Sequence, residues 1–167
     1  PPPAGGSVLH FILLDCSASM LQGNRLSLAK GLLLRWTAEC YRHREHLAVI
    51  GFSGPHARVL QPPRKAVAFN EAWIAAITGG GATPACSAVE LAERLLQQRQ
   101  RKQPAQAVAL WLLTDARFSE LPPRPRHADL CTVVDFDDAA VALGRAARIA
   151  DAWGAELLRA GELIDPH

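Results

Sequence analysis

The feature that most constrains this chain is an apolar run that ends abruptly in a carboxylate and two hydroxyls. Residues 8–14 (Val-Leu-His-Phe-Ile-Leu-Leu) are followed directly by Asp15, Ser17 and Ser19. Such a run predicts a buried strand, although periodicity alone does not separate it from a buried helix. In an extended loop, alternate side chains point the same way, so the three oxygen-bearing groups can converge. That set suits a hard cation, Mg²⁺, Mn²⁺ or Ca²⁺, better than zinc.

Two other segments can complete a cation site. Residues 79–84 (Gly-Gly-Gly-Ala-Thr-Pro) put the hydroxyl of Thr83 in a glycine-rich turn, and residues 108–115 form a second apolar run that ends in Asp115. In an open parallel sheet, ligands bind outside the carboxyl ends of the strands. The candidate metal residues are therefore Asp15, Ser17, Ser19, Thr83 and Asp115.

These three segments, in this order, resemble the metal-ion-dependent adhesion site of von Willebrand factor A (vWA) domains. Ala29-Lys30-Gly31, the glycine turn and Val133-Val134-Asp135 are most similar to the C-terminal A domain of the D-type subunit of magnesium chelatase and its relatives. The resemblance covers about Val8 to Leu163. It implies a Rossmann-like, doubly wound α/β fold. The mostly parallel six-stranded sheet would have the order 3-2-1-4-5-6, with strand 3 antiparallel and helices on its flanks.

The resemblance also implies a role for each residue. Ser17 and Ser19 would bind the cation through their hydroxyls, and Thr83 would bind it directly or through water. The two aspartates would act mostly through water or by orienting the serine hydroxyls. The family usually has glycine where Ala18 and Ala116 stand. Alanine directly after the second aspartate predicts a loop that is stiffer or differently set.

The function implied by the resemblance is a metal-dependent protein–protein interaction module of an ATP-dependent metal (magnesium or cobalt) chelatase-like complex. The module would not hydrolyse ATP. It would dock onto an Asp or Glu of an AAA+ ATPase subunit or of a large tetrapyrrole-binding subunit. The alternative is a stand-alone vWA adhesion or adaptor domain that binds another protein ligand. A third hypothesis, a hydrolase or phosphatase using the same carboxylates, lacks a general base or nucleophile pair by spacing.

Structural interpretations compete at several positions. Asp15 and Ser17 can cap the helix that follows. Cys16 beside the site is either a reactive thiol or a packed small side chain, and the second is expected. A hydrogen-bonded core histidine is expected at position 10. Three later acids either bind a second cation or serve as helix caps and a strand-end hydrogen bond: Asp135, Asp137 and Asp138.

Bulk properties limit the class of protein. With 167 residues, 49% of them hydrophobic, the chain fits one globular domain at 8–167. Residues 1–7 read as a proline- and glycine-rich linker or the edge of an excised fragment. A net charge of +2 argues against a nucleic-acid partner. Four cysteines without metal or redox spacing, and no signal peptide or membrane-spanning run, favour a reduced, cytoplasmic protein. Whether the chain is a fragment or a stand-alone relative is open.

Periodicity and turn signals place the remaining elements. One helix is predicted from Asn24 to about Arg44, with Arg25 largely outside its apolar stripe. A short edge strand, Ala57–Leu60, is predicted to stop at Pro62-Pro63. Further helices are expected at Val67–Ile77, at Pro84–Gln100, and from an Asp137 or Asp138 cap to Trp153; further strands are expected at Leu47–Phe52, Asp129–Val134 and Ala155–Leu158.

Overall fold

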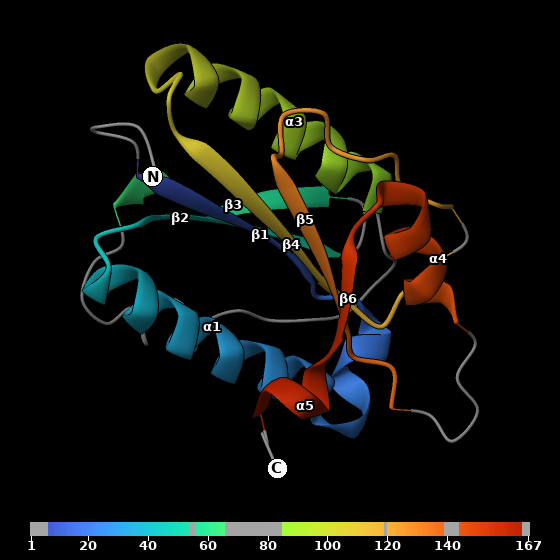
Figure 1. The fold of residues 1–167 in the computed structure, drawn as a ribbon. Coiled ribbons are helices and arrows are strands. Elements are labelled where there is room, and N and C mark those ends of the chain that lie inside the picture. Colours follow the sequence, from blue (N-terminus) through green and yellow to red (C-terminus); the bar gives the residue numbers. More distant parts are fainter. Residues whose placement is uncertain (1–6, 54–55, 66–84, 119, 139–143, 165–167) are drawn as a thin grey trace.

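One six-stranded sheet organises the molecule (Figure 1). The computed structural model describes residues 7–53, 56–65, 85–118, 120–138 and 144–164. The strand order is β3-β2-β1-β4-β5-β6, and every neighbouring pair is parallel except β2 with β3. The predicted fold class and strand order are therefore confirmed. The strands are β1 (Val8–Asp15), β2 (His46–Ser53), β3 (His56–Lys65), β4 (Ala107–Thr114), β5 (Leu130–Asp135) and β6 (Glu156–Arg159).

Helices cover both faces of the sheet. Figure 1 shows α1 and α5 on one face and α3 and α4 on the other. Their bounds, with the 3-10 helix η1 that leads into α1, are η1 (Ala18–Asn24), α1 (Arg25–Arg42), α3 (Ala85–Lys102), α4 (Arg145–Trp153) and α5 (Ala160–Ile164). The helix predicted at Val67–Ile77 and the glycine turn with Thr83 lie outside the described residues.

The central strand β1 is apolar at most of its positions because helices cover both of its faces. Leu9, Phe11 and Leu13 belong to the cluster under α3 and α4. Ile12 and Leu14 belong to the cluster under α1. Side chains of a strand alternate between the two faces, so a strand covered on both sides needs a continuous apolar run. The apolar run ends at Asp15, where the chain leaves the sheet and polar side chains begin, although Asp15 and Ser17 are themselves buried.

The edge strand β3 is longer than predicted, because it runs through Pro62 and Pro63 to Lys65. Its register with β2 shifts between the Val49–Gln61 and Leu47–Arg64 pairs, so the prolines fall in a bulge. A proline has no N–H to donate and is tolerated on an edge strand or at a bulge. The expectation that the prolines stop the strand was wrong for this reason.

Helix α4 begins later than the predicted aspartate caps. Its N-cap residue is Gly144, and residues 139–143 lie outside the described part of the chain. Asp137 and Asp138 therefore do not cap it, and their carboxylates have other partners, described below. The C-terminal end agrees with the prediction, since Gly154 closes α4 in the left-handed conformation with φ of 60°.

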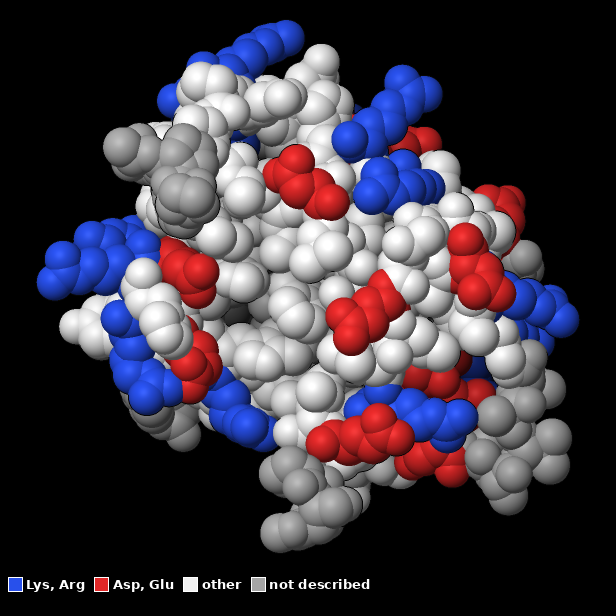
Figure 2. Space-filling model, in the orientation of Figure 1, with Lys and Arg blue, Asp and Glu red and all other residues white. Residues whose placement is uncertain are grey.

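Charge is spread over the surface in both signs. Figure 2 shows basic side chains interspersed with acidic ones around the edge of the face in view, whose centre carries few charges. This agrees with the net charge of +2. A search of the described residues finds no helix long and apolar enough to cross a membrane.

Candidate metal centre

The centre of the candidate site is the loop that leaves β1. Parallel pairing with β2 and β4 holds the end of β1 in the middle of the sheet. The backbone N–H of Ser17 then donates to Asp15 Oδ1 at 2.9 Å, which folds the loop back over the strand end. Ser17 is the N-cap residue of η1 but makes no side-chain capping hydrogen bond. Its hydroxyl instead lies 3.2 Å from that of Ser19, so the helix-cap interpretation does not hold for Ser17.

Asp15 is a fully buried carboxylate whose two oxygens are both held. Besides the Ser17 N–H on Oδ1, the Thr114 hydroxyl donates to Oδ2 at 2.6 Å. Burial raises the pKa of Asp15 to about 6; hydrogen bonds from Ser17 and Thr114 oppose the rise, and the negative charge of Asp115 adds to it. An ionised Asp15 is therefore costly in this position unless a positive charge comes close.

Asp115 follows β4 and is also buried. Its Oδ1 accepts from the backbone N–H of Arg117 at 3.3 Å, and its Oδ2 accepts from Arg25 Nη1 at 3.2 Å. Between Asp115 and Arg117 in the chain, Ala116 adopts the left-handed conformation with φ of 57°. This is the position where the family usually has glycine, so the loop keeps a glycine-type turn at a cost in strain.

Arg25 connects the loops of this region through hydrogen bonds, a role that its sequence pattern did not predict. The prediction placed it largely outside the apolar stripe of α1, whereas it is 5% exposed. Besides Asp115, its guanidinium donates to the carbonyl of Ser19 at 3.1 Å and to Asp138 Oδ1 at 3.0 Å from Nε and 2.6 Å from Nη2. It therefore joins the loops that follow β1, β4 and β5. Its position four residues before the buried Ala29 was the available signal.

The acids after β5 bind arginines. Arg117 Nη2 donates to Asp137 Oδ1 at 3.1 Å, and Arg25 holds Asp138. The expected role of Asp137 and Asp138 as caps of α4 was wrong. The N-cap residue of α4 is Gly144, and guanidinium groups from distant segments bind the two carboxylates. Asp135 Oδ1 accepts from the backbone N–H of Asp137 at 2.8 Å, which is the strand-end hydrogen bond expected there.

The chemistry of these groups fits a hard divalent cation. Adjacent ligands of an octahedral Mg²⁺ with bonds of about 2.1 Å lie about 3.0 Å apart. The hydroxyl oxygens of Ser17 and Ser19 are separated by 3.2 Å. Both carboxylates are already held by hydrogen bonds, so the hydroxyls would be the direct ligands of a bound cation and the carboxylates would orient them. The structure thus brings four predicted residues together, while Thr83 lies outside the described residues.

Another group of metal-type side chains lies near the start of β1. Ligand atoms of His10, Cys40 and Glu45 lie within 4.8 Å of one another. Trp111 Nε1 donates to His10 Nδ1 at 3.3 Å, so the neutral ring carries its proton on Nε2, which faces Glu45 at 3.2 Å. A protonated nitrogen is not a metal ligand, and this group carries no metal assignment. His10 is hydrogen-bonded as predicted, but it is half-buried and does not belong to the core.

The cysteine beside the candidate site is a packed side chain, as expected. Cys16 is 4% exposed, and burial raises the pKa of its thiol to about 12. The four cysteines are free thiols, of which Cys86 is half-buried and the other three are buried.

Comparison with known sequences decides the family. A family profile described as "von Willebrand factor type A domain" matches residues 11–117, which include both aspartates of the candidate site. The chain belongs to this family. A magnesium-chelatase 60 kDa subunit from Cereibacter sphaeroides is 33% identical to this vWA chain over 110 residues, covering 66% of the chain and 19% of that subunit. A magnesium-chelatase 67 kDa subunit from Chlorobaculum parvum is 31% identical over 109 residues, covering 65% of the chain and 17% of that subunit.

The longest of these matches is to an uncharacterised protein of Mycobacterium tuberculosis, 28% identical over 95% of this chain and 27% of that protein. The chain thus spans about a quarter or less of the length of these relatives. Among solved structures, the SpRpn10 VWA domain superimposes with a TM-score of 0.67 at 13% identity, covering 96% of this chain and 95% of that one. A von Willebrand factor type A protein from Catenulispora acidiphila gives 0.65 at 16% identity, covering 96% of this chain and 41% of that one. At such identities the structural matches support the vWA fold alone.

Proposed function

We propose that this vWA domain is a metal-dependent protein-interaction module of an ATP-dependent metal-chelatase-like complex. It would dock onto a carboxylate of a partner through a divalent cation, Mg²⁺ or in its place Mn²⁺ or Ca²⁺. The observation that carries the proposal is the pair of serine hydroxyls, 3.2 Å apart, in the loop that starts at the buried Asp15. The similarity to magnesium-chelatase subunits supports the choice of complex.

The residues around the serines define what the site can do. The direct ligands, Ser17 and Ser19, are neutral hydroxyls, and the charge of Asp115 is partly neutralised by Arg25 at 3.2 Å. A cation held by such a set keeps most of its positive charge and presents an open position that favours an anionic oxygen from outside. Asp15 accepts hydrogen bonds from Ser17 and Thr114, so its role is to orient the loop.

The proposed partners are an AAA+ ATPase subunit, a large tetrapyrrole-binding subunit, or both, each offering an Asp or Glu. The test is a binding assay with the immobilised chain and each subunit, purified from the same organism. It is run with Mg²⁺, with EDTA, and with the Ser17→Ala/Ser19→Ala double variant. The serines are better targets than Asp15, because removing the buried Asp15 also breaks its bond to Thr114.

Capture of either subunit is expected only with Mg²⁺ and wild-type protein. Ser27→Ala removes an exposed hydroxyl of α1 and is the matched control, which should bind like wild type. Thr83→Ala is expected to weaken capture, and wild-type capture would give the glycine turn a purely structural role. Equal capture in all conditions would support the proposed partner but show that a bound metal does not mediate the interaction. If neither subunit binds under any condition, the chelatase assignment is wrong, and a vWA adhesion or adaptor role becomes the better hypothesis.

A further inference from the structure

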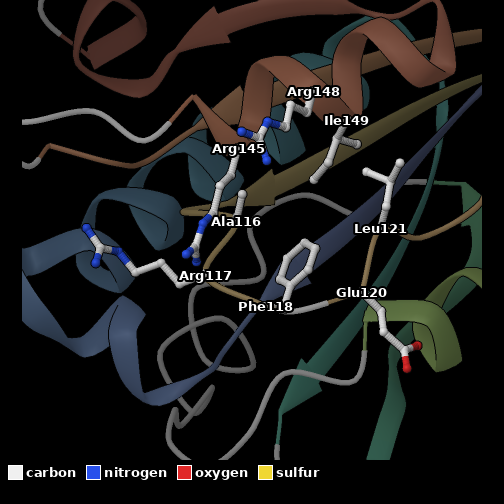
Figure 3. A pocket seen from close by; sticks show the side chains of 8 residues that line it. All are labelled: Ala116, Arg117, Phe118, Glu120, Leu121, Arg145, Arg148 and Ile149. Carbon is white, nitrogen blue, oxygen red and sulfur yellow. The ribbon is translucent and has the colours of Figure 1, made fainter.

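A cavity of about 400 Å³ opens beside the candidate metal centre (Figure 3). Its wall starts at Ala116, the residue directly after Asp115, and continues along the loop that follows β4. The other wall is the first half of α4. The lining residues are Ala116, Arg117, Phe118, Glu120, Leu121, Arg145, Arg148 and Ile149.

Positive charge dominates this cavity. Three of its lining residues are arginines, against the single acid Glu120, whose carboxylate points away from the guanidinium groups in Figure 3. Arg117 is engaged with Asp137 at 3.1 Å. Arg145 and Arg148 are exposed and make no ion pair with another described residue. Because both side chains are exposed and line the cavity, an incoming anion can reach their guanidinium groups.

The position of these arginines is unfavourable for the helix that carries them. Arg145 and Arg148 lie in the first turns of α4, which has no acidic residue in its first turn. The N-terminal end of a helix carries a partial positive charge. Cationic side chains there lower the stability of the helix, whereas acidic side chains would raise it. The same arrangement attracts anions, because helix dipole and side-chain charges add.

The far side of the cavity is apolar. Phe118, Leu121 and Ile149 face a common space in Figure 3, and Leu121 is 54% exposed. A free phosphate needs no such wall, whereas a peptide segment with an acidic and an apolar side chain uses both parts of the cavity.

We propose that the cavity is a second subsite for the partner segment that the metal centre grips. The inference rests on the proposed function. The partner carries a second Asp or Glu a few residues from the metal-bound one, because the cavity begins at Ala116, directly after Asp115 of the candidate centre. This second carboxylate pairs with Arg145 and Arg148, and an apolar side chain between the two acids packs on Phe118 and Leu121.

The test measures binding of two labelled ten-residue peptides by fluorescence anisotropy in Mg²⁺. One peptide has an acid, an apolar residue and a second acid three positions after the first; in the other, the second acid is replaced by its amide. Wild type should bind the diacidic peptide about fivefold more tightly at low salt, and the preference should shrink at high salt. Arg145→Gln/Arg148→Gln should abolish the preference and leave binding of the amide peptide unchanged. Arg101→Gln, an exposed arginine of α3, is the matched control.

If these arginines had only a structural role, replacing them would lower affinity and stability together. The subsite proposal predicts a different pattern for Arg145→Glu. This variant should lower affinity for the diacidic peptide at least fivefold while leaving the urea midpoint of unfolding equal or higher, since an acid suits the helix start. The subsite is overturned if wild type shows no preference between the peptides, if neither peptide binds, or if inorganic triphosphate binds the arginines and the peptides do not. The proposed function fails separately: EDTA and Ser17→Ala/Ser19→Ala would then leave binding of the amide peptide unchanged.

Discussion

At the scale of single residues, the candidate centre balances two buried acids against one buried arginine. Asp115 has that arginine, Arg25, at 3.2 Å, whereas Asp15 has only hydrogen-bond donors from Ser17 and Thr114. The two buried carboxylates therefore have different neighbours, a cation beside one and only hydrogen-bond donors beside the other. The difference gives two predictions, one for each acid.

The pKa of Asp15, raised to about 6 by burial, predicts a pH-dependent cost of folding without metal. The unfolded chain releases this proton near 3.8, so ionisation destabilises the folded state as pH rises from about 4 to 6. The full effect is about 3 kcal/mol. In EDTA, Asp15→Asn should therefore gain stability relative to wild type on going from pH 4.5 to pH 7.5. Urea unfolding at the two pH values measures the change, and an unchanged difference between the two proteins contradicts the assignment.

Removing Arg25 should be costly because Asp115 is left buried without its cation. Arg25→Met is expected to lower the free energy of unfolding by about 3 kcal/mol. Asp138→Asn, at the other end of the same guanidinium, should cost about 1 kcal/mol or less, because the Asp138 side chain is 55% exposed. Denaturant unfolding of both variants tests the ranking. Equal costs would show that the buried contact with Asp115 is not the important one.

At the scale of elements, the site depends on how each parallel strand ends. The loop after β4 turns through Ala116, which is buried and has a positive φ. The sequence indicated this turn only through a resemblance to a family that has glycine there. Alanine tolerates the left-handed region at a cost, whereas a β-branched residue does so poorly.

Substitutions at Ala116 should therefore separate strain from packing. Ala116→Gly relieves strain but loses a buried methyl and gains unfolded-state entropy, so stability should stay within about 1 kcal/mol of wild type. Ala116→Val should cost at least about 2 kcal/mol, since it puts a β-branched side chain in the left-handed conformation at a buried position. Thermal unfolding measures both changes. A valine variant as stable as wild type would contradict the left-handed conformation.

At the scale of the whole molecule, the sequence predicts the architecture well because the strands carry strong signals. The apolar runs before Asp15 and Asp115 read as buried strands, and parallel pairing then brings their carboxyl ends together. The arginine network was not predictable in the same way. Asp115 lies 90 residues after Arg25 in the chain, and Asp138 lies 113 residues after it, so local spacing does not link them. Local rules also failed at Pro62-Pro63, where tertiary context made a bulge acceptable.

The central claim is that the two serine hydroxyls bind a divalent cation, and a Mn²⁺ titration followed by electron paramagnetic resonance tests it most directly. Wild type and the Ser27→Ala control should bind one Mn²⁺ with equal affinity, and excess Mg²⁺ should displace it. The Ser17→Ala/Ser19→Ala variant should lose at least about tenfold in affinity. If that variant folds and binds Mn²⁺ as tightly as wild type, the cation is held elsewhere and the proposed docking mechanism is wrong.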